Sequence, residues 1–252
     1  MSNERPTVKK LSNGLEIIFL RYSSAPAIAL DLWVRSGSTC ETANEAGLAH
    51  VVEHMLFKGT KTRGPGEIAA QIENLGGEIN AYTSFDHTVY TALVASRYAK
   101  AGLEVLADAL FNSVFDENEL FMEKKVVLEE IRRARDLPQH CLSRNLFKSA
   151  YGTHPYGLPV IGNEESVMGF ASKDCKNFVK KWYRPSNMTL VAVGDISEEK
   201  FFSLAGQIFG SKPPAPPPRK PKIPAKAPRQ GFRGFVEQKP VGEIYFDLAF
   251  PI

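Results

Sequence analysis

The sequence contains few of the features that would place it in a specialised structural class. It has three cysteines among 252 residues, and no two of them have the C-x-x-C spacing of a thiolate zinc site or the pattern of a disulfide framework. No apolar run approaches the ~20 residues of a membrane-spanning helix. Residues 1–10 are polar where a signal peptide would be apolar. We therefore expect a protein of a reducing compartment, cytoplasmic and bacterial in type because a transit peptide is also lacking.

The net charge is also small. At +3 it gives no indication of a nucleic-acid or membrane partner. Part of the positive charge falls in residues 211–229, which hold eight of the 17 prolines, interleaved with lysine and arginine. This composition predicts an extended linker.

What the chain does have is the apolar content of one hydrophobic core, with 43% hydrophobic and 23% charged residues. Its length predicts one large domain, or one domain with an extension. Local signals divide the chain into elements: a capping box at residues 42–45, a first-turn proline at Pro65 and a break at Leu137-Pro138. We predict strands over 15–20, 27–34, 78–83, 88–94, 188–193 and 244–250, and helices over 43–57, 65–75, 173–182 and 198–209, with three more between 96 and 151.

The sequence His50-Val51-Val52-Glu53-His54 carries the clearest chemical signal. On a helix, histidines four apart lie on one face, one turn apart, and two imidazoles are a normal pair of zinc ligands. Glu53 can reach the same side and take a proton from zinc-bound water. The motif is the reversed form of the better-known zinc motif. Two surface histidines on an amphipathic helix are the alternative, but the surrounding apolar residues favour burial, where an unpartnered His-Glu-His group is costly.

A catalytic zinc needs a further ligand from another element. Glu123, Glu129 and Glu130 lie on a helix that begins near Asp116. Glu123 and Glu130 are seven apart and share a face, while Glu129 points about 100° away from Glu130. Each of the three could equally be a solvated glutamate on a charged helix, so the pattern alone leaves the further ligand open.

Three stretches resemble the pitrilysin-type M16 zinc metallopeptidases, a family that includes insulin-degrading enzyme and the mitochondrial processing peptidases. Residues 47–60 (GLAHVVEHMLFKGT) are similar to the family's zinc helix well beyond the motif itself. Residues 75–84 (LGGEINAYTS) resemble its substrate-binding strand. Glu130 stands 76 positions after His54 (130 − 54), where the family places its third zinc ligand. The resemblance covers nearly the whole chain.

The resemblance implies an α+β fold, a mostly antiparallel sheet flanked by helices of the pitrilysin/LuxS-like metallohydrolase type. It implies a zinc-binding peptidase domain over residues 1–210, a proline-rich linker over 211–231 and the truncated start of a second homologous domain over 232–252. Family members have two or four such domains around a closed chamber. A second domain or subunit is therefore an expected partner, and this chain alone is expected to be weakly active or inactive.

The resemblance also implies the site residues. His50, His54 and Glu130 would bind Zn2+, and Glu53 would act as the general base. Glu123 matches a second glutamate that supports activity in the family. Because it lies two turns from Glu130, we do not expect it to touch zinc.

Asn80 and Ala81 match the strand edge along which the family's substrate lies, and an extended peptide can add to a sheet edge through main-chain hydrogen bonds. The implied function is a zinc-dependent endopeptidase that hydrolyses extended peptides or unfolded polypeptides with a zinc-activated water. The alternative is a non-catalytic zinc-binding partner or scaffold subunit of a peptidase assembly, against which the retained zinc motif argues. A structural zinc domain fits less well, because structural sites are usually closed by four protein ligands and favour cysteine.

Overall fold

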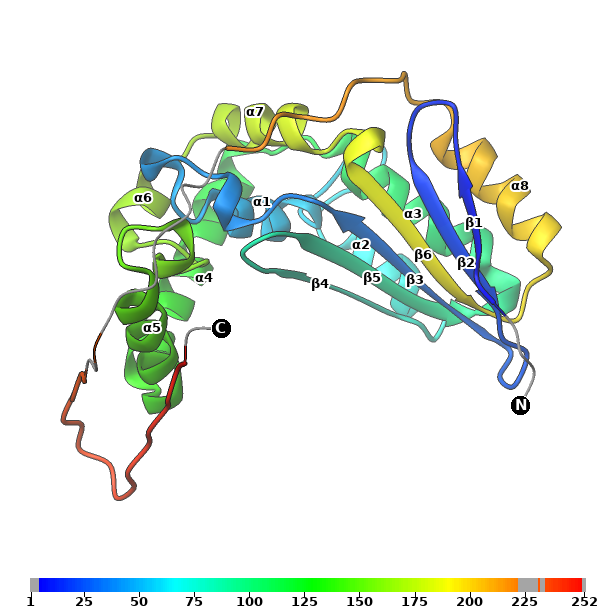
Figure 1. Cartoon of the computed structure of the whole chain (residues 1–252). Helices are drawn as coiled ribbons and strands as arrows, with labels where there is room; N and C mark the ends of the chain where they lie inside the picture. Colours follow the sequence, from blue (N-terminus) through cyan, green and yellow to red (C-terminus); the bar gives the residue numbers. More distant parts are fainter. Residues whose placement is uncertain (1–4, 222–230, 232–233, 251–252) are drawn as a thin grey trace.

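The computed structural model describes residues 5–221, 231 and 234–250 of the chain (Figure 1). Its centre is a six-stranded sheet with the strand order β1-β2-β6-β3-β5-β4. Neighbouring strands are antiparallel except for the parallel pair β2 and β6. The strands are β1 (Thr7–Lys10), β2 (Glu16–Arg21), β3 (Ala27–Val34), β4 (Glu78–Thr83), β5 (Thr88–Ala95) and β6 (Met188–Gly194). The expected α+β fold with a mostly antiparallel sheet is confirmed.

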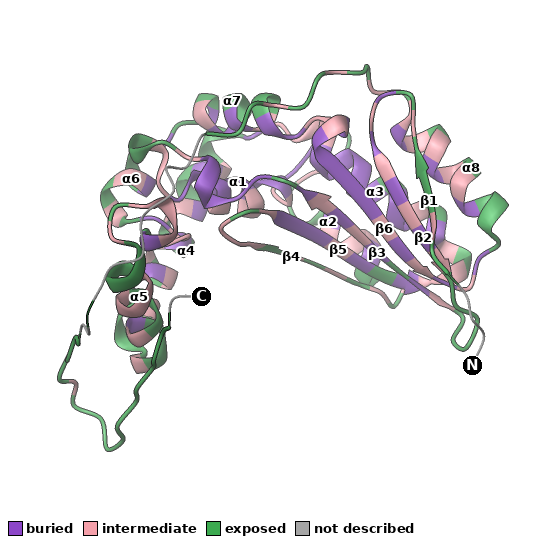
Figure 2. Ribbon diagram, in the orientation of Figure 1, coloured by how far each residue is buried: buried purple, intermediate pink, exposed green. Residues whose placement is uncertain are grey.

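Alternation of side chains along the strands separates the two faces of this sheet. In β3, Ile28, Leu30 and Leu32 are buried, whereas Ala29 is exposed and Asp31 only partly buried. Successive residues of a strand point to opposite faces, so the buried set forms the floor of the hydrophobic core. Figure 2 shows the same contrast as purple bands that alternate with paler ones along the central strands.

Eight α-helices occur in the described residues. Helix α3 contacts β3 and β5, helix α8 contacts β2, and helices α1 and α2 contact β4. Figure 1 shows α4, α5 and α6 grouped beyond one end of the sheet, with α5 pointing away from it. The helices are α1 (Leu48–Leu56), α2 (Glu67–Glu73), α3 (Ala99–Asn112), α4 (Glu117–Asp136), α5 (Pro138–Tyr151), α6 (Glu164–Gly169), α7 (Ser172–Trp182) and α8 (Glu198–Phe209).

Most of the predicted elements are present. The strands over 27–34 and 78–83 and the helix over 198–209 have the predicted bounds, and α4 and α5 meet at the predicted break before Pro138. The helix predicted over 43–57 is wrong at its start. Its capping box, Thr42 with Glu45, exists but belongs to a 3-10 turn over Ala43–Glu45. Helix α1 begins later because Gly47 has the left-handed φ of 91° and separates the two segments.

The strand predicted over 244–250 is also wrong, since these residues form neither a strand nor a helix. Alternating apolar residues form a strand only beside a neighbour that supplies backbone partners, and no described strand pairs with them. Residues 211–221 have no helix or strand either, and the rest of the predicted linker, apart from Gly231, lies outside the described residues. None of the described helices combines the length and the apolar composition that crossing a bilayer requires.

Candidate active site

Helix α1 is fixed at its N-terminus by Glu41. The carboxylate of Glu41 accepts hydrogen bonds from the N–H groups of Gly47 (2.9 Å) and Ala49 (2.7 Å), which have no partner inside the helix. Burial raises the pKa of Glu41 to about 8, although these two N–H groups act to lower it. A Cβ on Gly47 would stand 2.7 Å from the carbonyl oxygen of Ile161, so the start of α1 is determined by a close backbone approach that glycine alone permits.

The apolar side of helix α1 is buried. This burial turns the polar side of the helix towards α4. Val51, Val52 and Met55 are almost fully buried, and the helix contacts α7, α4 and β4. The motif residues between them, which are His50, Glu53 and His54, are only partly buried.

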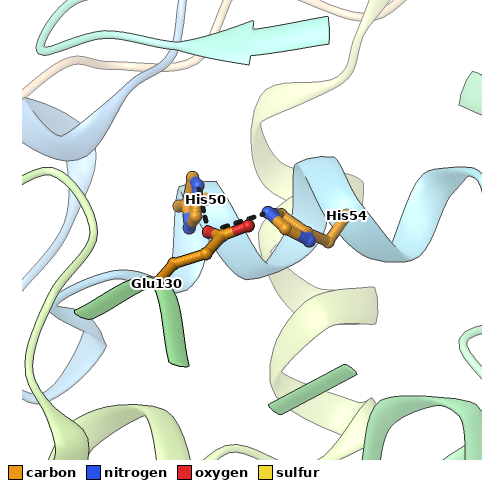
Figure 3. A group of neighbouring side chains, drawn as sticks. All are labelled: His50, His54 and Glu130. Atoms are coloured by element: carbon orange, nitrogen blue, oxygen red, sulfur yellow. Dashed lines mark ion pairs between the residues drawn. The ribbon is translucent and has the colours of Figure 1, made fainter. Parts of the chain in front are cut away.

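Helix α4 supplies the two glutamates that face this helix. Asp116 caps its N-terminus by accepting hydrogen bonds from two backbone N–H groups. Oε2 of Glu130 lies 3.7 Å from Nε2 of His50 and 3.6 Å from Nε2 of His54 (Figure 3). The structure thus brings together the three residues that the resemblance implies as zinc ligands.

The spacing of these donor atoms suits zinc. Ligand atoms of the three residues all lie within 4.8 Å of one another. A tetrahedral zinc ion with bonds of about 2.0–2.1 Å holds its ligand atoms about 3.3–3.4 Å apart, so each nitrogen–oxygen pair needs to close by only a few tenths of an ångström. Two imidazoles and one carboxylate form the donor set of a catalytic zinc, which keeps one position open.

Glu123 contacts His54 from the side opposite Glu130. Its Oε1 lies 2.8 Å from Nδ1 of His54, and its Oε2 lies 2.6 Å from Nζ of Lys58. A proton on Nδ1 leaves the Nε2 lone pair of His54 directed at Glu130, so this contact orients the ring for metal binding. Burial acts to raise the pKa of Glu123, but the hydrogen bonds from His54 and Lys58 outweigh it and the pKa is lowered. Glu123 is not part of the group of three side chains that could hold a metal ion, and its role remains a prediction.

The two histidines differ in their surroundings. Burial, and next the neighbouring His54, lower the pKa of His50 to about 3, so its imidazole is neutral and ready to bind a metal. Its Nδ1 is buried and has no hydrogen-bond partner in the described part of the chain. Burial acts to lower the pKa of His54 too, but the hydrogen bond to Glu123 and the carboxylate of Glu130 raise it overall. Because His54 holds its second proton more tightly than His50 does, metal binding has to compete with protonation mainly at His54.

Glu53 is held from the sheet. The hydroxyl of Thr83, the last residue of β4, donates a hydrogen bond to Oε2 of Glu53 at 2.5 Å. Burial raises the pKa of Glu53, and the hydrogen bond from Thr83 partly offsets this. Sequence reasoning did not single out Thr83. The alternation in β4 could have done so, because Ile79, Ala81 and Thr83 share the face that points to the helices.

Strand β4 also carries Asn80 and Ala81. It is the last strand of the sheet and pairs only with β5, so its other edge has no strand partner in the described residues. Asn80 is exposed, and its Oδ1 accepts the N–H of Ala81 at 2.8 Å. The two residues therefore stand on a free strand edge beside α1, which β4 contacts.

Glu129 is the glutamate that the structure does not bring into the group. It lies on the solvent side of α4 in an ion pair with Arg132, as its angle from Glu130 predicts. Lys58 and Glu41 are further residues of the site that sequence reasoning missed. Lys58 lies four residues after His54, beyond the end of α1, and its approach to Glu123 depends on how α1 and α4 pack.

Comparison with known proteins gives consistent results. The family model described as Insulinase (Peptidase family M16) matches residues 17–164, and that described as Peptidase M16 inactive domain matches residues 170–251. The chain is 38% identical over 199 residues to the "Uncharacterized zinc protease YmxG" of Bacillus subtilis, covering 79% of this chain and 48% of that protein. It is 32% identical to the "Probable mitochondrial-processing peptidase subunit beta, mitochondrial" of Arabidopsis thaliana, covering 83% and 39% respectively. The chain thus spans about half the length of the curated relatives or less.

Solved structures show the same fold. A protease from Helicobacter pylori superposes with a TM-score of 0.83 at 30% identity, covering 89% of this chain and 55% of that one. An M16 inactive domain from Pseudomonas fluorescens gives 0.80 at 25% identity, covering 88% and 54%. Because a domain described as inactive shares the fold, the fold alone does not establish activity. With the family model matched over more than half of its residues, the chain belongs to the M16 peptidase (insulinase) family.

Proposed function

We propose that this chain provides the zinc site of an endopeptidase that hydrolyses extended peptides. The observation that carries the proposal is that Oε2 of Glu130 lies 3.7 Å from Nε2 of His50 and 3.6 Å from Nε2 of His54. Glu53 lies on the same helix as the two histidines, α1. Proteins named zinc proteases are among the relatives, which supports zinc as the metal.

The residues of the chain have separate parts in the proposed reaction. Zinc, when bound, supplies the Lewis acidity that activates water and the scissile carbonyl. Glu53 takes the proton of the attacking water and returns it to the leaving amine. Thr83 engages Oε2 of Glu53 and leaves Oε1 for this transfer. Burial raises the pKa of Glu53, which moves a carboxylate towards the range where it accepts and releases protons at neutral pH.

The peptide would bind as an added strand along β4. The free edge at Asn80 and Ala81 offers backbone groups that pair with any extended chain, so binding would depend little on the side chains of the peptide. The N–H of Ala81, held by the Asn80 side chain, would exchange this partner for a peptide carbonyl.

We further propose that residues 1–210 form the zinc domain, that 211–231 link it to a second homologous domain, and that residues 232–252 begin that domain. In a protein that carries both domains, the two would enclose the peptide. This chain alone would then bind zinc and hydrolyse peptides weakly or not at all.

Metal analysis and a peptidase assay test the proposal. The chain should bind one zinc ion, and the complete protein should cleave an unstructured peptide, lose this activity to a chelator and regain it with zinc. Glu53→Gln should keep the zinc and lower kcat by roughly 10²–10⁴-fold, the usual contribution of a general base. Zinc binding by a complete wild-type protein that cleaves no peptide would favour a non-catalytic scaffold, and wild-type rates in Glu53→Gln would exclude the base.

A further inference from the structure

We infer that Thr83 is a positioning residue that holds Glu53 in its reactive orientation and connects it to the strand on which the peptide would lie. The inference rests on the proposed function, because it assigns a task to the residue that fixes the general base. It comes from the hydrogen bonds around Glu53, where the Thr83 hydroxyl has two possible acceptors, Oε2 of Glu53 at 2.5 Å and the oxygen of Thr88 at 3.3 Å.

The direction in which the Thr83 hydroxyl donates its proton follows from the hydrogen bond made by the neighbouring Thr88. The hydroxyl of Thr88 is fully buried and donates to the carbonyl oxygen of Ser36 at 3.0 Å. A hydroxyl has one proton to donate, so Thr88 has none left for Thr83, whose oxygen lies 3.3 Å away. The proton of Thr83 is directed to Oε2 of Glu53 at 2.5 Å, since a carboxylate is the stronger acceptor.

Glu53 has no comparable support elsewhere. Among the described residues, Thr83 is its one hydrogen-bond partner, and Oε1 accepts none. The side chain has three rotatable bonds and would otherwise occupy several rotamers. The single hydrogen bond from β4 therefore restricts the rotamers of Glu53 and engages Oε2, which leaves Oε1 without a hydrogen-bond partner among the described residues.

The position of Thr83 in β4 links this contact to the proposed peptide edge. Thr83 pairs with Thr88 at the end of the β4–β5 ladder, three residues after Asn80. Strand β4 is supported by β5 on one edge only, and it packs on α1. A peptide added to its free edge would pair both edges and fix the backbone that carries the Thr83 hydroxyl. Occupation of the strand would thus also align the base.

Substitutions at Thr83 test this assignment in the complete, zinc-loaded protein. Thr83→Val keeps the shape and removes the donor, and it should lower kcat for an unstructured peptide by roughly 10- to 100-fold, the value of a hydrogen bond to a charged group. KM should change by less than about 3-fold, because the backbone edge remains. Thr83→Ser restores the hydroxyl and should recover most of kcat. A Thr83→Val enzyme with wild-type kcat, or a Thr83→Ser enzyme as slow as Thr83→Val, would overturn the inference.

Two measurements that do not depend on activity accompany the assay. Zinc affinity, determined by competition with a chromophoric chelator, should be the same in the wild type and both Thr83 variants, since the hydroxyl of Thr83 is hydrogen-bonded to Glu53 and lies near Thr88, neither of which is a proposed ligand. The second measurement is the equilibrium constant for unfolding of the metal-free wild type, Thr83→Val, Glu53→Ala and the double variant. If the two side chains interact, the fold-change in the double variant should differ by at least about 3-fold from the product of the fold-changes in the two single variants. A fold-change equal to that product would refute the contact. A zinc-loaded wild-type protein that cleaves no peptide would overturn the proposed function and this inference together, whereas an active wild type with an indifferent Thr83→Val would refute the inference alone.

Discussion

Replacing Glu123 by glutamine separates the orientation of a ligand from the ligand itself. The carboxylate of Glu123 accepts from Nδ1 of His54 at 2.8 Å and from Nζ of Lys58 at 2.6 Å. An amide of the same shape has one oxygen and one NH2 group. With its oxygen on His54, its NH2 group opposes the Lys58 ammonium. With its oxygen on Lys58, its NH2 group meets Nδ1 and drives the imidazole proton to Nε2, the nitrogen that would bind zinc.

Either arrangement weakens the proposed metal site. Loss of a hydrogen-bonding partner behind a metal-bound histidine usually lowers metal affinity by about 10- to 100-fold, which corresponds to about 1.4–2.7 kcal/mol at 1.36 kcal/mol per tenfold change. The unpaired ammonium of Lys58 adds repulsion to a cation. Lys58 is 34% exposed, so solvent screens this repulsion and we expect Glu123→Gln to stay within that range.

Competition with a chromophoric chelator at neutral pH measures this affinity. Glu129→Gln is the matched control, because it removes the same charge from the same helix, where Glu129 is exposed and pairs with Arg132. It should change the zinc affinity by less than about 3-fold. An unchanged affinity in Glu123→Gln would refute the orienting role, and an equal loss in Glu129→Gln would show that only the overall charge matters.

Two further predictions concern the start of α1. The pKa of Glu41 rises from its ordinary 4.5 to about 8 on folding, so the stability that it contributes is complete below about pH 4.5 and is lost as the pH rises towards 8. The melting temperature of the metal-free chain should therefore fall more steeply between about pH 5 and 8.5 than that of Glu41→Gln, and parallel curves would contradict the raised pKa. Gly47→Ala should lower the free energy of unfolding by more than Gly66→Ala, since both glycines have a positive φ but only the Cβ at position 47 meets backbone. The strain common to both is roughly 1–3 kcal/mol, and equal denaturation midpoints would refute the effect of the contact with Ile161.

The parts of the site that lie on one helix could be predicted from the sequence. His50 and His54 share a face because an α-helix repeats every 3.6 residues, whatever packs around it. Glu129 could be set apart from Glu130 by the same geometry. The choice of Glu130 over Glu123 came from the resemblance to a family, because spacing alone left both on one face of α4.

The contacts between elements could not be predicted in the same way. Thr83 meets Glu53 across 30 positions of sequence, and this depends on how β4 packs beside α1. Lys58 reaches Glu123 only because the chain after α1 passes close to α4. The start of α1 at Leu48 was missed because Gly47 lies against Ile161, more than a hundred residues later, and no local signal reports that approach. The strand over 244–250 was predicted from alternation, which says nothing about whether a partner strand is present.

The division of the metal group between two helices has a consequence for how the chain holds together. His54 and Glu130 are 76 residues apart (130 − 54), and β4, β5, α2 and α3 all lie between them in sequence. A metal bound to both would act as a reversible cross-link that closes this segment into a loop, and its binding free energy would add to the stability of the loop. Strand β4, along which the peptide is proposed to bind, lies inside that loop. Without a metal, the packing of α1 on α4 and the contacts of Glu123 with His54 and Lys58 would close this loop.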